Sequence, residues 1–83
     1  MNKTITVKIF TISKGLEVKD DIKIIRIKSK DYNLLIMEDY LPIVGKIEGN
    51  IDFESENDSL KLENVKGYYM HSNNVFNFIL KED

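Results

Sequence analysis

A period-two alternation of apolar and polar residues is the feature that most constrains how this chain can fold. In the segment 4–12, the apolar residues Ile5, Val7 and Ile9 are separated by polar ones. Side chains of a strand point alternately to its two faces, so this pattern predicts a half-buried strand. No segment of ten or more residues has the i, i+3, i+4 spacing of an amphipathic helix. The chain also lacks Ala, the best helix former, and contains 12 Ile, which favour strands.

Turn signals divide the chain into short segments. Lys14-Gly15, Gly49-Asn50 and Asn73-Asn74 have turn chemistry, and residues 55–59 form the most polar loop. Pro42 has no backbone N–H, which predicts a bend or a sheet edge there. The sequence therefore predicts an all-β fold, a flattened β-sandwich or barrel of roughly eight to ten short strands. A chain of 83 residues is expected to form one domain, spanning residues 1–83.

The predicted core combines aliphatic strands with aromatic residues near the C-terminus. Residues 22–27 are apolar on much of both faces, which indicates a central strand with Ile24 in the core. Residues 34–37 form a second, short buried run. The aromatic residues have few basic neighbours, so core packing is favoured over stacking on nucleic-acid bases. They are Tyr68, Tyr69, Phe76 and Phe78.

The chain offers few residues for catalysis. The lack of Cys removes disulfides, a thiolate nucleophile and a zinc knuckle from consideration. The only His, His71, is expected to be a surface or hydrogen-bonded residue. The carboxylate pairs Asp20-Asp21 and Glu38-Asp39 are chain neighbours, so they are expected to point apart into solvent. The sequence thus favours a non-catalytic binding or structural subunit over an enzyme, with no cofactor and no metal ion.

Charge is distributed unevenly along the chain. Residues 1–30 carry +5, from eight basic and three acidic residues, and residues 31–83 carry −7, from four and eleven. The stretch 31–58 alone has eight acids and one Lys, which are either solvated faces or an acidic surface for a basic partner. The net charge of −2 disfavours nucleic acid as a partner. No apolar run approaches the ~20 residues of a membrane span, so no membrane insertion is expected.

Three stretches share their order and spacing with a known family. Residues 7–18 form an opening strand, turn and strand, and residues 65–69 read Val-Lys-Gly-Tyr-Tyr against the family's Val-Ser-Gly-Gly-Phe. The most telling stretch, 35–44, reads Leu-Ile-Met-Glu-Asp-Tyr-Leu-Pro-Ile-Val against Gly-Ile-Leu-Pro-Gly/Asn-His-Ala-Pro-Leu-Val. The sequence therefore resembles the N-terminal β-sandwich domain of the epsilon subunit of F-type ATP synthases. It departs from the family at Leu35, Glu38, Tyr40 and Leu41, where the family has Gly, Pro, His and Ala.

The resemblance implies a non-catalytic central-stalk subunit that binds the gamma subunit and the membrane rotor ring and couples ion flow to ATP synthesis. The gamma-facing segment maps to Glu38, Asp39, Tyr40, Leu41 and Pro42. The ring-facing loop maps to Lys30, Asp31, Tyr32 and Asn33, with Asp31 nearest to the family's acidic residue. Tyr40 is expected either to anchor the gamma interface or to cap the bend before Pro42.

The family usually continues into two C-terminal helices that can brake ATP hydrolysis. Because this chain ends at Asp83, the resemblance implies a short form without them, natural or truncated. The implied location is cytoplasmic, peripheral on the inner face of the cell membrane within the synthase. The residues also leave open a free-standing β-sandwich interaction or inhibitor module that binds a basic protein through the acidic stretch 31–58.

Overall fold

The computed structural model describes residues 3–81, so the first two and last two residues of the predicted domain lie outside the described range. Six strands account for most of that range. They are β1 (Ile5–Thr11), β2 (Gly15–Ser29), β3 (Asn33–Ile36), β4 (Ile43–Ser55), β5 (Ser59–Ser72) and β6 (Val75–Lys81). The prediction of an all-β fold is confirmed, but the strands are fewer and longer than the roughly eight to ten expected.

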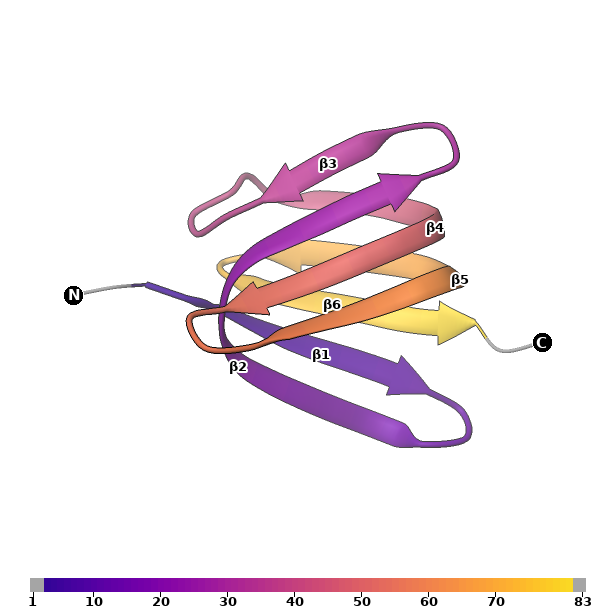
Figure 1. Ribbon diagram of the computed structural model, residues 1–83, viewed down its shortest axis with the longest axis horizontal. Coiled ribbons are helices and arrows are strands. Elements are labelled where there is room, and N and C mark those ends of the chain that lie inside the picture. The colour runs from indigo at the N-terminus through magenta and orange to yellow at the C-terminus, as the bar shows by residue number, and fades with distance from the viewer. Residues whose placement is uncertain (1–2, 82–83) are drawn as a thin grey trace.

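Five of the strands close into a barrel, as Figure 1 shows. Their order is β1-β6-β5-β4-β2, a second pairing of β2 with β1 closes the ring, and β3 extends the sheet beyond β2. Only the β1–β6 pair is parallel among the described pairings. Because closure pairs strands that would otherwise lie at sheet edges, the ring leaves few backbone groups unpaired.

The barrel is flattened into two layers, and its three long strands belong to both. The β3 layer contains β3 with residues 22–29 of β2, 51–55 of β4 and 59–62 of β5. The β6 layer contains β6 and β1 with residues 15–19 of β2, 43–49 of β4 and 65–72 of β5.

β2 crosses between the layers at Asp20-Asp21. Its residues 15–19 pair with β1, and its residues 22–29 pair with β4. The register shifts in both pairings near this point, and Asp21 has a φ of 62°. A β-bulge bends a strand and increases its twist, so one continuous strand can serve both layers.

β4 and β5 turn the opposite corner together. The turn predicted at Gly49-Asn50 is wrong, because β4 continues through it with a register shift between Gly49 and Ile51. Across from it, Asn64 of β5 has a φ of 54°, and its N–H donates to Asn50 Oδ1 over 3.0 Å. A Cβ at Gly49 would collide with the carbonyl oxygen of Lys28, so the close approach of β2 requires Gly.

The other predicted turns are confirmed. Asn73 and Asn74 have φ values of 51° and 60°, as a two-residue type I′ hairpin requires. Gly15 has a φ of 77° at the start of β2. The Ser55 N–H donates to the Asp58 carbonyl over 2.8 Å and closes the polar loop between β4 and β5. Local chemistry was sufficient at these sites because each turn is made by neighbouring residues.

The core lies between the two layers and draws on all six strands. Its buried apolar members are Ile5, Val7, Ile9, Ile22, Ile25, Ile27, Ile36, Ile47, Ile51, Phe53, Tyr69, Phe76 and Phe78. Phe53 of the β3 layer packs edge-on against Phe76 of the β6 layer, with ring centroids 5.9 Å apart. The two layers therefore share one aromatic centre.

The core position predicted for Ile24 is taken by its neighbour. Ile22 is buried, the register then shifts by one residue, and Ile25 is fully buried while Ile24 is only half-buried. A bulge exchanges the two faces of a strand, so the alternation read before it does not continue after it.

Two further core predictions are correct only in part. In the run 34–37, Ile36 is fully buried, but Leu35 and Met37 are each 49% exposed. Among the aromatic residues, Tyr68 is 58% exposed, while Tyr69 is buried. Period two places alternate residues outside even where the sequence is continuously apolar.

Candidate protein-binding surfaces

The outer surface of the β6 layer carries many exposed apolar side chains. Seven of them are between 46% and 67% exposed. We call them the apolar face: Phe10, Leu16, Val18, Val44, Tyr68, Met70 and Ile79. They come from β1, β2, β4, β5 and β6, so the set spans the whole width of the layer.

The sheet register brings these residues into two adjacent rows. In the first row, Tyr68 pairs with Ile79, Ile79 with Phe10, and Phe10 with Leu16. Directly opposed side chains on one face of a sheet are near neighbours, so this row is continuous.

The second row is apolar at both ends and polar in the middle. Val44 pairs with Met70, Met70 with Asn77, Asn77 with Lys8, and Lys8 with Val18. A shallow hollow of about 580 Å³ lies where β4, β5 and β6 meet in these rows. An apolar side chain of a partner could enter this hollow.

Lysines border the apolar face. Lys46 extends the first row, and Lys8 lies within the second. One row further toward the β4–β5 corner, Lys66 pairs with Lys81 on one side and with Glu48 on the other. Four lysines against one glutamate make this border positive.

An apolar patch with a polar border is typical of a protein-binding surface. The sequence analysis did not predict it, although a signal was present. Phe10 is an apolar residue at a position where the alternation of residues 4–12 assigns the solvent side. Leu16 and Val18 alternate with Glu17 and Lys19, so the sequence favours the inner side for them, and only the register places them beside Phe10 on the outer surface.

The outer surface of the β3 layer is charged instead. Arg26 pairs in register with Asp52, which pairs with Lys61 on its other side. Arg26 Nη1 donates to Glu54 Oε1 over 2.7 Å and to Asp52 Oδ2 over 3.2 Å. The hydrogen bond with Glu54 is the main cause that raises the pKa of Arg26. We call this surface the charged face.

The acidic stretch 31–58 is partly neutralised by basic residues elsewhere in the chain. Besides the two carboxylates bound by Arg26, Glu56 lies 3.6 Å from Lys23, and Asp39 lies 3.2 Å from Lys3. Four of its eight acids are thus in ion pairs. This leaves less free negative charge for a basic partner than the sequence suggests.

The segment 38–42, predicted to face gamma, lies between β3 and β4 at the end of the barrel that also holds the β5–β6 turn. The N–H of Asp39 donates to Asn74 Oδ1 over 2.6 Å, and its carboxylate accepts from Asn74 Nδ2 over 3.2 Å. The hydrogen bonds from Asn74 and then Lys3 lower the pKa of Asp39. The segment is therefore tied to the β5–β6 turn.

The other residues of this segment differ in exposure. Leu41 is 77% exposed, and Glu38 and Pro42 are also exposed. Tyr40 is half-buried, and its ring lies edge-on to His71 with centroids 6.4 Å apart. Tyr40 thus packs on the core, while Leu41 presents an apolar side chain to solvent.

The loop predicted to face the rotor ring, Lys30 to Asn33, lies at the other end of β3 (Figure 1). Asp31 is exposed and forms no ion pair within residues 3–81. The Lys30 N–H donates to the Glu48 carbonyl over 2.8 Å. Lys30, Asp31 and Asn33 thus remain exposed on a turn that is fixed to β4.

Tyr32 of the same loop points inward instead. Its hydroxyl donates to the Lys46 carbonyl over 2.6 Å, and it lies 3.0 Å from the Tyr69 hydroxyl. Because the Tyr32 hydroxyl already donates its proton to the Lys46 carbonyl, the Tyr69 hydroxyl is the donor in the bond between the two tyrosines. Tyr32 therefore closes the seam between the layers.

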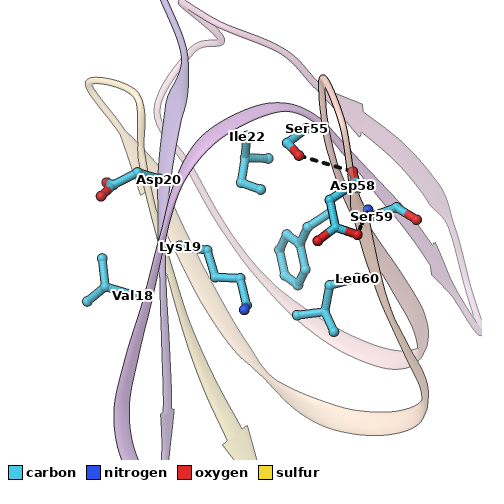
Figure 2. Close-up of a pocket in the computed structure, with 9 residues that line it drawn as sticks. Val18, Lys19, Asp20, Ile22, Ser55, Asp58, Ser59 and Leu60 are labelled. Carbon is cyan, nitrogen blue, oxygen red and sulfur yellow. Dashed lines mark hydrogen bonds between the residues drawn. The ribbon is translucent and has the colours of Figure 1, made fainter.

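Figure 2 shows a cavity at the opposite seam, between the first half of β2 and the start of β5. The volume of this cavity is about 250 Å³, and the Lys19 side chain extends into it. The Asp20 side chain points away from it and accepts a hydrogen bond from the Thr6 hydroxyl. The Asp58 carboxylate accepts a hydrogen bond from the Ser59 N–H over 2.8 Å, so it stabilises the turn between β4 and β5. Nowhere in residues 3–81 do three His, Asp or Glu side chains converge as metal ligands would.

The expectation that His71 is a surface or hydrogen-bonded residue is wrong. His71 is 0% exposed, and neither ring nitrogen has a hydrogen-bond partner within residues 3–81. Burial lowers the pKa of His71, so the neutral ring is the stable form in the core.

The fold is similar to that of a chain in the cryo-EM structure of the central stalk and c-ring of the Tetrahymena thermophila mitochondrial ATP synthase. The TM-score is 0.75 at 18% sequence identity, over 98% of this chain and 66% of that chain. This chain thus spans slightly less than two thirds of the length of the chain it resembles. Comparisons of the sequence with protein-family models and with curated proteins found no match. Within the described residues, no helix is long and apolar enough to cross a membrane.

Proposed function

We propose that this chain is a non-catalytic, epsilon-like subunit of the central stalk of a rotary ATP synthase. The observation that carries the proposal is a lysine-bordered apolar face on a fold that resembles, over 98% of the chain, a chain of an ATP synthase stalk and ring structure. A stalk subunit transmits torque, so it needs a rigid body with separate contacts to two partners. A closed barrel with an apolar face and two distinct loop ends meets that need.

The proposed gamma side combines the apolar face with residues 38–42. Val44 of the apolar face lies two residues after this segment, and Leu41 adds an exposed apolar side chain. Burial of apolar surface contributes about 25 cal/mol per Å², so this area offers the largest favourable term for association. In this proposal Tyr40 supports the segment from beneath and is not its main contact.

The proposed ring side is the loop Lys30, Asp31, Tyr32 and Asn33. Asp31 is its candidate contact, because it is exposed and forms no ion pair within the described chain. Tyr32 has a structural role through its bond to Lys46. The subunit would then lie peripherally on the inner face of the cell membrane, between gamma and the ring.

Affinity purification from native cells tests the proposal. The tagged chain should recover the alpha, beta and gamma subunits of a rotary ATP synthase, identified by mass spectrometry, and retain them at moderate salt. If none of these subunits is recovered, the proposal is wrong.

Two matched variants test the surface. Ile79→Asp places a charge in the centre of the apolar face and should abolish recovery of gamma. Leu35→Asp makes a comparable change at a residue of similar exposure on β3, so recovery should persist. If both variants are folded by circular dichroism and lose gamma equally, the apolar face is not the gamma-binding surface.

The ring contact needs a separate variant. Asp31→Lys should reduce recovery of the ring while recovery of gamma is unchanged. Glu63→Lys, an exposed acid of β5, is the control for added positive charge. Unchanged recovery of the ring would remove Asp31 from the contact.

An interaction or inhibitor module that uses the stretch 31–58 has less support. Half of its acids are already in ion pairs, and exposed charges are screened at physiological salt. Recovery of one basic protein that elutes readily with salt would favour this alternative.

A further inference from the structure

His71 is a buried polar group that the proposed binding surfaces do not use. Its side chain has no solvent exposure, and no residue from 3 to 81 forms a hydrogen bond with its Nδ1 or Nε2. A buried polar atom without a partner costs free energy, and adding a proton to such a ring costs more. The site therefore tolerates the neutral ring and penalises the imidazolium.

Three residues that pack on or pair with His71 are uncharged. Phe76 of β6 lies with its centroid 6.0 Å away, Ile43 of β4 is the cross-strand partner, and Tyr40 covers the ring from the segment before β4. Glu38 and Asp39 are the charged residues of the covering segment; Glu38 is exposed, and Asp39 binds Lys3 and Asn74. No carboxylate from these elements is therefore placed to stabilise a charged His71.

The neighbours differ in how easily they can move. Ile43 and Phe76 are in strands, so moving either one breaks ladder hydrogen bonds. Tyr40 lies outside the strands, half-buried, and its segment is fixed mainly by the Tyr40 N–H to Met37 carbonyl bond and the contacts of Asp39. Displacement of Tyr40 is the least costly way to bring water to His71.

We propose that His71 and Tyr40 form a pH-sensitive latch: protonation of His71 releases Tyr40 and opens the segment 37–42, while the rest of the barrel stays folded. At neutral pH the neutral ring holds Tyr40 in place. Since burial lowers the pKa of His71 below 6.5, the opening occurs on the acid side of that value. Asp39 cannot cause the same response, because its pKa lies below 3.8.

The latch goes beyond the proposed function, because it needs no partner and is tested on the isolated chain. NMR spectra between pH 7.5 and 5.0 follow both sides of it. His71 is the only His, so its ring signals are unambiguous. We expect the ring signals and the backbone amides of 38–41 and 43 to change with one shared midpoint below 6.5, while amides of β1 and β6 stay constant. A global loss of amide signals, different midpoints or no change above pH 5.0 would each overturn the proposal.

Two variants separate the latch from general acid sensitivity. His71→Phe keeps an aromatic ring without a titrating nitrogen, so the pH response of segment 37–42 should disappear. Tyr40→Ala exposes His71, so the ring midpoint should move up toward 6.5, the value of a solvated His. An unchanged midpoint in Tyr40→Ala, or a persistent response in folded His71→Phe, would contradict the latch. Because no readout involves gamma or the ring, these results do not depend on the stalk proposal.

Discussion

The two outer faces of the barrel share the three long strands β2, β4 and β5 and differ in chemistry. On the β3 layer, the row Arg26, Asp52 and Lys61 alternates in charge across three strands. On the β6 layer, the corresponding row runs Tyr68, Ile79, Phe10 and Leu16. β5 contributes to both, with Lys61 on the charged face and Tyr68 on the apolar face.

Under the proposed function, this difference separates the face adapted to water from the face adapted to a partner. Charges in register on the charged face satisfy one another and keep the surface soluble. Apolar residues in register on the apolar face add nothing to the core, which lies on the other side of the sheet. A face that costs solubility and gives no packing is best explained by a partner that covers it.

The largest expected effect is on the free energy of unfolding, and it distinguishes the shared core from the two outer faces. Phe53→Ala removes a fully buried ring that packs on Phe76 between the layers, so it should lower the free energy of unfolding by about 3–5 kcal/mol. Ile79→Ala, on the apolar face, should change it by less than about 0.5 kcal/mol. Urea unfolding measures both. A large loss in Ile79→Ala would mean that the apolar face contributes to folding.

The next effect compares two positions of β5. Tyr68→Ala should weaken binding to gamma roughly 30-fold, because truncation of a central interface aromatic costs about 2 kcal/mol. Lys61→Ala should leave the affinity within about twofold, since rim and non-contact residues contribute little. Titration calorimetry with purified gamma provides the affinities. Equal effects at the two positions would remove the functional distinction between the faces.

A smaller effect concerns the hydroxyl pair that joins the layers. Tyr69→Phe removes the bond to Tyr32 and should cost about 1 kcal/mol of unfolding free energy at neutral pH. Burial raises the pKa of Tyr69 above its unfolded value of about 10, so its stabilisation is complete below pH 10 and is lost as the pH rises further. Urea unfolding at pH 7.5 and 10.5 should therefore show a smaller difference between wild type and variant at the higher pH. A constant difference would show that Tyr69 titrates alike in both states.

The smallest effect is expected on the charged face. Arg26→Met removes the charge at the centre of the row and leaves Asp52 and Glu54 without their shared partner. Because Arg26 is only half-buried and its ion pairs are open to solvent, the melting temperature should fall far less than in Phe53→Ala, and gamma binding should not change. Differential scanning calorimetry and the same titration check this. A large loss of gamma affinity would extend the binding surface to the charged face.

Local features of the fold could be predicted from the sequence, and features that depend on distant pairing could not. The hairpin at Asn73-Asn74 was predictable because the two residues make their own turn. The bend at Gly49 was mistaken for a turn, because Gly indicates a backbone irregularity without saying whether the strand continues. Ile24 was misplaced because the bulge before it depends on the pairing with β4.

The candidate surfaces show the same division. The segments 30–33 and 38–42 were predicted from the family resemblance, and they lie at the two ends of β3. The apolar face was not predicted, because it consists of one or two residues from each of five strands that only the register brings together. His71 was misjudged for a related reason: its burial depends on Tyr40, 31 positions earlier in the chain.

By itself, the sequence determined that the chain is all-β, through period-two alternation and the absence of helical spacing, and it located the local turns. The tertiary structure decided how many strands there are, which side of each strand is inside, and which exposed residues form a surface. The physical reason is that alternation and turn chemistry act between neighbouring residues. Bulges, register and barrel closure are fixed by hydrogen bonds between residues far apart in the chain.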